Sequence, residues 1–247
     1  MLGNERQEAI LELLRKEKSA AVKAIAAKLY VSEATVRRDL KEMQDLGLLK
    51  RNHGGAVLLE AADEISIFVR MTENAREKER AAANALAEVP ANFNTVFLDS
   101  SSTVLALAQR LDLAEKTVIT NSLQTALRLS KVRGINLVLS GGRVSRTGAS
   151  VAGSWANNLL RDFRFDLMLT SCAGIREKGA FETSMEQREL KRTVFERSDV
   201  RILIADHTKF DAPAPYLFRE LADFDKVIFD CLPAERRAAL GDLPVIC

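Results

Sequence analysis

The sequence predicts an α/β protein in which a small, mainly helical N-terminal domain precedes a larger domain with a mostly parallel sheet. Two observations predict this. The first 58 residues combine three helical patterns with one glycine-turn hairpin, whereas the remainder alternates short apolar runs with helical patterns. We therefore place the first domain at residues 1–58, a linker at 59–74 and the second domain at 75–247.

Three helices are expected in the first domain. The first two cover residues 6–16 and 22–29, where apolar residues recur at helical spacing. The third begins at Ser32, a favoured N-cap, and its apolar stripe runs through Val36, Leu40 and Met43. Because few residues separate the second and third helices, the pattern is that of a helix-turn-helix.

A hairpin is expected over residues 48–58, where two short apolar runs flank a Gly-Gly turn. Gly47 offers the preceding helix a C-terminal stop. Such a hairpin would be the wing of a winged helix-turn-helix. Charge supports nucleic-acid binding only weakly, since residues 1–58 hold 11 Lys and Arg against 8 Asp and Glu.

The third helix carries cationic residues opposite its apolar stripe. Adjacent arginines most often belong to a solvated helix face, but this pair lies in the third helix of a helix-turn-helix beside a basic wing. Arg37, Arg38 and Thr35 are candidates for base edges or phosphates, and Lys41 and Arg51 for the DNA backbone. The full set of DNA-binding candidates is Ser32, Thr35, Arg37, Arg38, Lys41, Arg51 and His53.

Composition places the chain among ordinary globular proteins, with 47% hydrophobic and 28% charged residues. No apolar run reaches the roughly 18 residues of a membrane span, so we expect a cytoplasmic protein without membrane contact. Cys172, Cys231 and Cys247 are widely spaced and have no neighbouring ligand cluster in the sequence. Neither a disulfide framework nor a metal site is expected, and no cofactor is indicated.

The second domain is predicted to open with a helix from Ala75 to Leu86. Short apolar runs then follow one another, separated by helical patterns, as buried parallel strands do. The predicted strands are 95–99, 117–120, 136–139, 166–170, 200–205 and 226–229.

Polar residues follow five of these strands. One Ser-rich loop is more often a turn or an N-cap than a ligand site, but parallel strands bring all five endings to one edge of the sheet. Hydroxyl and amide groups at the start of the helical pattern after Asp99 suit a phosphate. The endings are 99–103, Asn121-Ser122, 140–143, 171–174 and 206–209.

Two segments of the first domain, 32–40 and 50–56, carry Ser-x-x-Thr-Val-Arg-Arg-Asp-Leu and Lys-Arg-Asn-His-Gly-Gly-Ala. In these motifs and their spacing the chain resembles the DeoR family of bacterial transcriptional regulators. The resemblance extends to the second domain and implies a fold similar to ribose-phosphate isomerases and glucosamine-phosphate deaminases. It implies a repressor of sugar catabolism genes that responds to a phosphorylated sugar.

The resemblance carries 99–103 over as the phosphate loop and 189–192 as a helix that supplies an acid and a cation. Ser101 stands where the family commonly has Gly. The effector-binding candidates are Asp99, Ser100, Ser101, Ser102, Thr103, Asn121, Gly141, Gly142, Gly174, Glu189, Lys191, Asp206 and Lys209.

Two alternatives stay open at this point. An isomerase-like enzyme with a DNA-binding domain could use carboxylates at this edge of the sheet, called the polar rim below, as a base. A constitutive DNA-binding protein would need the first domain but not the polar rim. We expect a non-enzymatic regulator whose partners are a double-stranded DNA operator and a phosphorylated sugar, and which forms a homodimer or homotetramer.

Overall fold

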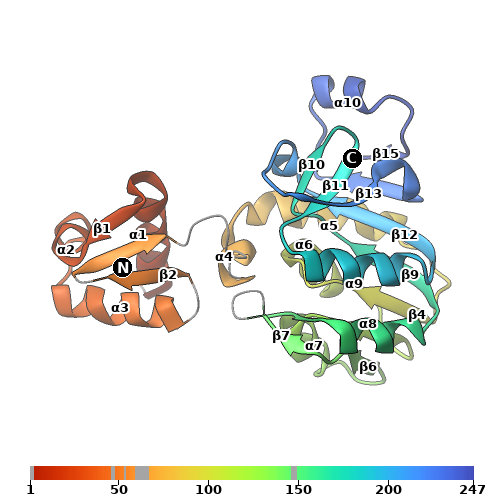
Figure 1. The fold of residues 1–247 in the computed structure, drawn as a ribbon, viewed down its shortest axis with the longest axis horizontal. Coiled ribbons are helices and arrows are strands. Elements are labelled where there is room, and N and C mark those ends of the chain that lie inside the picture. Colours follow the sequence, from red (N-terminus) through yellow and green to blue (C-terminus); the bar gives the residue numbers. More distant parts are fainter. Residues whose placement is uncertain (1–2, 46–47, 53, 59–66, 146–148) are drawn as a thin grey trace. The chain divides into compact units, whose positions relative to one another are not determined.

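The computed structural model of the chain describes residues 3–45, 48–52, 54–58, 67–145 and 149–247. Two compact units, which divide between Arg70 and Met71, are each described by themselves (Figure 1). The division falls inside α4 (Ile67–Thr72), which lies within the segment expected to be a linker. The rest of that segment up to residue 66, and the expected helix stop at Gly47, are outside the described residues.

The N-terminal unit is a winged helix-turn-helix, as the sequence predicts. Its helices are α1 (Gly3–Glu17), α2 (Val22–Leu29) and α3 (Glu33–Asp45). The Ser32 hydroxyl accepts a hydrogen bond from the Thr35 backbone N–H at 3.1 Å, which confirms the predicted N-cap of α3. The expected hairpin consists of β2 (Leu49–Asn52) and β3 (Gly55–Leu58).

One strand of this unit is not predicted. β1 (Ser19–Ala21) pairs with β3 and completes a three-stranded antiparallel sheet in the order β1-β3-β2. A Cβ atom at Gly55 would lie 2.2 Å from the Ala20 carbonyl oxygen, so only glycine permits this approach of the two strands.

A buried ion pair ties α1 to α3. The Arg6 Nε and Nη2 atoms donate to the two carboxylate oxygens of Asp39 at 2.5 and 2.9 Å. The side chains are only 10% and 2% exposed, and the hydrogen bond to Asp39 raises the pKa of Arg6. Because two fork-like contacts fix the geometry, the pair sets the position of α3 on the apolar core. That core includes Ile10, Leu14, Ile25, Val36, Leu40 and Met43.

The C-terminal unit is built on a seven-stranded parallel sheet in the order β15-β14-β12-β9-β4-β5-β6. All six predicted strands are present, with ends that differ by at most two residues. In chain order the strands are β4 (Thr95–Leu98), β5 (Thr117–Thr120), β6 (Asn136–Leu139), β9 (Phe165–Thr170), β12 (Ser198–Ala205), β14 (Lys226–Phe229) and β15 (Val245–Ile246).

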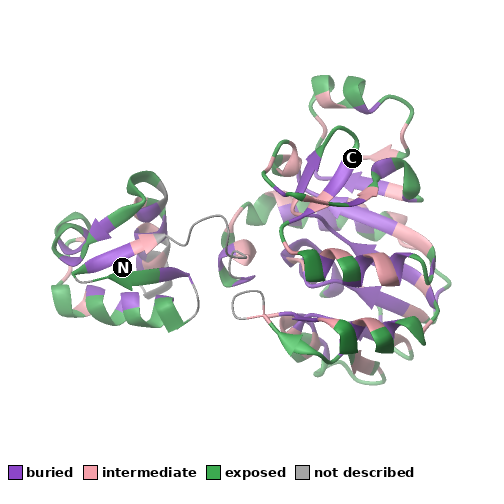
Figure 2. Ribbon diagram, in the orientation of Figure 1, coloured by how far each residue is buried: buried purple, intermediate pink, exposed green. Residues whose placement is uncertain are grey.

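Helices cover both faces of this sheet (Figure 1). Residues of β12 alternate between two cores: Ile202 and Ile204 belong to one, Leu203 and Ala205 to the other. Figure 2 shows the five inner strands buried along most of their length, as expected for a sheet covered on both sides, while the edge strands β6 and β15 are only partly buried or exposed. The helices are α5 (Ala75–Glu88), α6 (Ser102–Ala108), α7 (Leu123–Leu129), α8 (Ser154–Arg161), α9 (Met185–Phe195) and α10 (Ala234–Leu240).

Two smaller sheets lie outside the sequence prediction. Strands β10 (Gly174–Arg176), β11 (Gly179–Glu182) and β13 (Tyr216–Glu220) form an antiparallel sheet, and β7 (Arg143–Val144) pairs with β8 (Val151–Ala152). Short 3-10 helices, η1 (His207–Lys209) and η2 (Leu221–Asp223), complete the unit. Among the described residues no helix is both long enough and apolar enough to cross a membrane.

Candidate functional site

The exposed face of α3 carries the predicted DNA contacts. Arg38 and Lys41 are exposed, and neither has an ion-pair partner among the described residues. Arg37 is held by Glu33, with Nη2 3.0 Å from the carboxylate, one helical turn away. Two cations of α3 are thus available to phosphates or base edges while the opposite face of the helix is buried.

The remaining DNA-binding candidates lie beside that helix. The hydroxyl groups of Ser32 and Thr35 are 2.9 Å apart at its start. Arg51 is exposed on β2, and its backbone N–H donates to the Gln44 side chain at 3.0 Å, which ties the wing to the end of α3. His53 lies outside the described residues.

In the C-terminal unit, the polar residues that follow the strands meet at the carboxyl edge of the sheet. Asp99, directly after β4, is fully buried. One of its carboxylate oxygens accepts from the Ser101 backbone N–H at 2.9 Å. The other accepts from the Thr170 hydroxyl at 2.8 Å and the Ser171 backbone N–H at 2.9 Å, so Asp99 joins the ends of β4 and β9.

Lys191 of α9 is the cation at this edge, and it is buried. Its ammonium group lies 2.8 Å from Asp99 Oδ2 and 2.6 Å from Glu182 Oε1, and it donates to the Ser171 carbonyl at 2.7 Å. Because an ammonium group has three donors, these partners occupy all of them. Lys191 therefore organises the rim and has no donor left for a ligand.

The ionisation of this cluster follows from burial and charge. Burial alone would oppose charge on Asp99, but the charge and hydrogen bonds of Lys191 hold its pKa below the ordinary value. Burial likewise opposes charge on Lys191, and the carboxylates of Asp99 and Glu182 outweigh it and raise its pKa. Both groups are charged at neutral pH.

A second buried network centres on Asn121, after β5. Its amide nitrogen donates to the Gln187 side-chain oxygen at 3.0 Å and to the Val151 carbonyl at 3.2 Å. The Gln187 amide nitrogen in turn donates to the Ser150 hydroxyl at 2.9 Å, and the Ser100 hydroxyl approaches Gln187 at 3.4 Å. Residues from four separate segments are thereby held in one arrangement.

Four buried oxygen atoms at this edge have no hydrogen-bond partner among the described residues. They are Asn121 Oδ1, Ser140 Oγ, Ser171 Oγ and Asp206 Oδ2, and they follow β5, β6, β9 and β12. Two are acceptors and two are hydroxyl groups. Because leaving a buried polar group unpaired costs about 1–3 kcal/mol, these four oxygens are candidates for contacts with ordered water or a ligand.

Other predicted effector residues shape the loops. Ser101 has an extended backbone (φ −80°) and caps α6, so this position requires no glycine. Ser102 and Thr103 are buried in the first turn of that helix. Gly142 and Gly174 are places of close approach, where a Cβ atom would lie 2.7 Å from the Ala152 carbonyl and 2.3 Å from the Ala212 carbonyl respectively.

Gly141 is exposed with φ +67°, and beyond it Gly142 borders an open cleft of about 430 Å³ with Arg143, Ser154 and Glu186. Asp206 Oδ1 accepts from the backbone and hydroxyl of Thr208. Lys209 is half-buried and has no ion-pair partner among the described residues. Burial raises the pKa of Cys172 to about 12, and the charge of Glu182 adds to this rise. Lys209 lies in η1, directly after β12, the strand that pairs with β9.

Glu189 is not brought to this cluster. It is exposed, pairs with Arg188 and borders a surface depression with Arg161 and Arg192. Glu189 and Lys191 are two residues apart on α9, so their side chains lie on different faces of the helix. The acid that contacts Lys191 is Glu182 of β11.

The sequence reasoning also missed Gln187, which lies one turn before Lys191 and on the same face of α9. Helical spacing counted back from Lys191 is the signal that could have found it. Glu182 carries no comparable signal, because it reaches the site through a strand pairing that the sequence does not predict.

Sequence comparison supports both units. Residues 6–62 match the DeoR-like helix-turn-helix domain and residues 73–231 the DeoR C-terminal sensor domain. The transcriptional regulator GolR of Listeria innocua is 34% identical over 93% of this chain and 91% of its own. The glycerol-3-phosphate regulon repressor of Escherichia coli is 28% identical over 94% and 93%.

Among solved structures, a ribose 5-phosphate isomerase from Methanocaldococcus jannaschii is similar, with a TM-score of 0.38 and 14% identity over 56% of this chain and 55% of the isomerase.

The exposed arginine of α3 gives the first prediction. Replacing Arg38 with Ala should weaken binding to DNA fragments selected by the wild-type protein by about 1–3 kcal/mol, because a phosphate or base contact is lost. Fluorescence anisotropy at several salt concentrations measures this. Arg133→Ala, which removes an exposed arginine from the other unit, is the control. Equal affinities for the two variants would contradict the assignment of α3.

The buried ammonium group of Lys191 gives the second prediction. Lys191→Met should destabilise the C-terminal unit by about 3–5 kcal/mol, because Asp99 and Glu182 are left facing each other without a cation. With its lowered pKa, Asp99 contributes stability above its ordinary pKa of 3.8 and loses it as the pH falls further. In the variant, burial raises the pKa of Asp99 instead, so protonation relieves the uncompensated charge and the acid-dependent loss of stability should shrink or reverse.

Urea unfolding followed by circular dichroism across acidic and neutral pH measures both effects. Lys226→Met is the matched control, because it breaks a partly exposed pair with Glu88 at 2.7 Å, which should contribute at most about 1 kcal/mol. Similar losses in the two variants, or an unchanged acid dependence, would argue against a buried cation at the rim.

Proposed function

The chain belongs to the DeoR family of transcriptional regulators, and from this we propose that it represses sugar catabolism genes until a phosphorylated sugar binds its C-terminal unit. It is a DNA-binding regulator and not an enzyme, since the relatives that match along nearly its whole length are named as regulators and repressors. We take residues 1–58 as the DNA-binding domain and 75–247 as the sensor.

The observation that carries this proposal is the set of four unpartnered oxygens at the carboxyl edge of the sheet. A sugar bound at the ends of the adjacent strands β9 and β12 offers hydroxyl groups that donate to the Asp206 oxygen and accept from the Ser171 hydroxyl. Ligands of open α/β sheets bind at this edge. The surrounding hydrogen bonds hold these groups in place before a ligand arrives, which reduces the entropy cost of binding.

A phosphate would be held by Lys209 in this proposal. Lys191 already has a partner for each of its three donors, whereas the half-buried ammonium group of Lys209, in η1 after β12, has no ion-pair partner among the described residues. The Ser100–Thr103 segment, which follows β4 at the same edge of the sheet and opens α6, offers further hydroxyl and backbone N–H groups. The name of the glycerol-3-phosphate regulon repressor, a relative over nearly the full length, is consistent with a phosphorylated effector.

We further propose that the protein acts as a homodimer or homotetramer on a double-stranded operator. A single winged helix offers limited contact, and paired half-sites call for at least two copies. Sedimentation velocity at the concentrations used for DNA binding should give a mass of at least twice 27.3 kDa. A single species of monomer mass bound to the operator would refute this part.

The sensing proposal predicts a phosphate-dependent stabilisation. At about 100 times the Kd, a ligand should stabilise the native protein by roughly 2.7 kcal/mol, which a thermal-shift assay detects as a rise in Tm. Hexose, pentose and triose phosphates are compared with their unphosphorylated forms and with inorganic phosphate. Lys209→Met should lose the advantage of the phosphorylated form, and Asp206→Asn should weaken both forms.

Lys131→Met, which removes an exposed lysine elsewhere in the unit, should respond like the wild type. DNA binding without ligand should be unchanged in Lys209→Met. If no sugar phosphate raises the Tm of the wild-type protein, the sensing proposal fails while the assignment as a DNA-binding regulator stands.

A further inference from the structure

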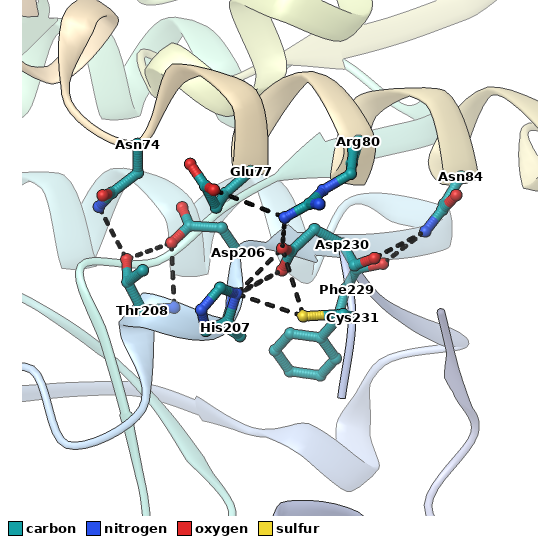
Figure 3. Close-up of polar contacts among 10 residues, drawn as sticks. All are labelled: Asn74, Glu77, Arg80, Asn84, Asp206, His207, Thr208, Phe229, Asp230 and Cys231. Atoms are coloured by element: carbon teal, nitrogen blue, oxygen red, sulfur yellow. Dashed lines mark hydrogen bonds and ion pairs between the residues drawn. The ribbon is translucent and has the colours of Figure 1, made fainter. Parts of the chain in front are cut away.

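Three side chains with metal-binding donor atoms converge at the ends of β12 and β14. His207 opens η1 after β12, and Asp230 and Cys231 follow β14. Figure 3 shows the imidazole, carboxylate and thiol groups directed toward one another. The His207 Nδ1 atom lies 3.0 Å from Asp230 Oδ2 and 3.4 Å from Cys231 Sγ, and that sulfur lies 3.5 Å from Asp230 Oδ2.

We propose that His207, Asp230 and Cys231 form a binding site for one divalent transition-metal ion of the zinc type. The site is separate from the proposed effector contacts, since none of its three residues is among them. An imidazole nitrogen, a carboxylate oxygen and a thiolate are all ligands of Zn²⁺, whereas a thiolate is a poor ligand for Mg²⁺ and Ca²⁺.

The spacing of the three donor atoms fits such an ion. Bond lengths of about 2.0–2.3 Å at tetrahedral angles place ligand atoms roughly 3.4–3.6 Å apart. The triangle formed by Nδ1, Oδ2 and Sγ has edges of 3.0, 3.4 and 3.5 Å. Small side-chain rotations would open the shortest edge to the required length.

The surroundings differ for the three ligands. The Asp230 side chain is fully buried, and its Oδ1 atom accepts from the His207 backbone N–H at 2.7 Å, which leaves Oδ2 toward the other two donors. Asn84 of α5 donates to the Phe229 carbonyl at 2.8 Å and so fixes the end of β14. Cys231 is exposed, so an ion can enter from solvent and the fourth position is open to water.

Arg80 is the competing cation. Its Nη2 atom lies 3.3 Å from Asp230 Oδ2 and 3.5 Å from Glu77 Oε1, and its side chain is 59% exposed (Figure 3). Because Glu77 is a second partner on the same helix, Arg80 can leave Asp230 without losing every carboxylate contact. The ion and the deprotonated thiol would then balance the charge of the cluster.

The test uses the full-length protein, reduced and freed of metal with a chelator. Titration with Co²⁺ should produce near-ultraviolet thiolate-to-cobalt charge-transfer absorption that saturates at one ion per chain, and Zn²⁺ should abolish it. Cys231→Ser should remove the absorption. His207→Gln and Asp230→Asn should each weaken Co²⁺ binding by at least about 10-fold, because losing a ligand costs no less than losing an outer-shell partner.

Cys247→Ser is the matched control, since it removes the other exposed thiol and should bind Co²⁺ as the wild type does. Circular dichroism melting verifies that each variant is folded. The proposal is overturned if the wild-type protein shows no charge-transfer band, if the band persists in Cys231→Ser, or if His207→Gln binds Co²⁺ with unchanged affinity. In each case the three side chains form only a hydrogen-bonded cluster.

Discussion

The rim of the C-terminal unit depends on one buried ammonium group. Lys191 reaches from α9 to the ends of β4, β9 and β11 by contacts with Asp99, the Ser171 carbonyl and Glu182. Burying a charge is expensive, and the cost is tolerable here because two carboxylates and a carbonyl surround the ammonium group. The same contacts fix the loops that follow β4 and β9, so the groups proposed to bind the effector are held in place without a ligand.

The polar groups of the rim are of two kinds: some are fully hydrogen-bonded to neighbouring residues, and others have an oxygen without a hydrogen-bond partner among the described residues. The first kind includes the side chains of Asp99, Lys191 and Gln187, which form hydrogen bonds with neighbouring residues. One buried oxygen has no partner within the described part of the chain in each of four residues, Asn121, Ser140, Ser171 and Asp206. In the N-terminal unit the division is similar, because Arg6 and Asp39 form a buried pair while Arg38 stays exposed on α3.

The elements that could be predicted from the sequence are those with a clear hydrophobic pattern. The parallel strands were found because strands covered on both faces are continuously apolar, and α3 because Ser32 and an apolar stripe mark it. β1 and the antiparallel sheet escaped because three- and four-residue strands stabilised by distant partners have no pattern of their own. Glu189 came from the family resemblance, and Glu182 was not considered, because its contact with Lys191 depends on the pairing of β11 in that sheet. His207 and Cys231 are likewise adjacent only once β12 and β14 pair.

Each unpartnered oxygen at the rim follows a different strand. The apolar side chains that hold those strands together point into the two cores and are not among the proposed effector contacts. Natural selection can therefore alter one loop at a time, exchanging an amide for a hydroxyl or a short side chain for a long one, without disturbing the framework. If the rim binds the effector as proposed, a few independent substitutions in these loops are enough to change the ligand specificity of a protein with this fold.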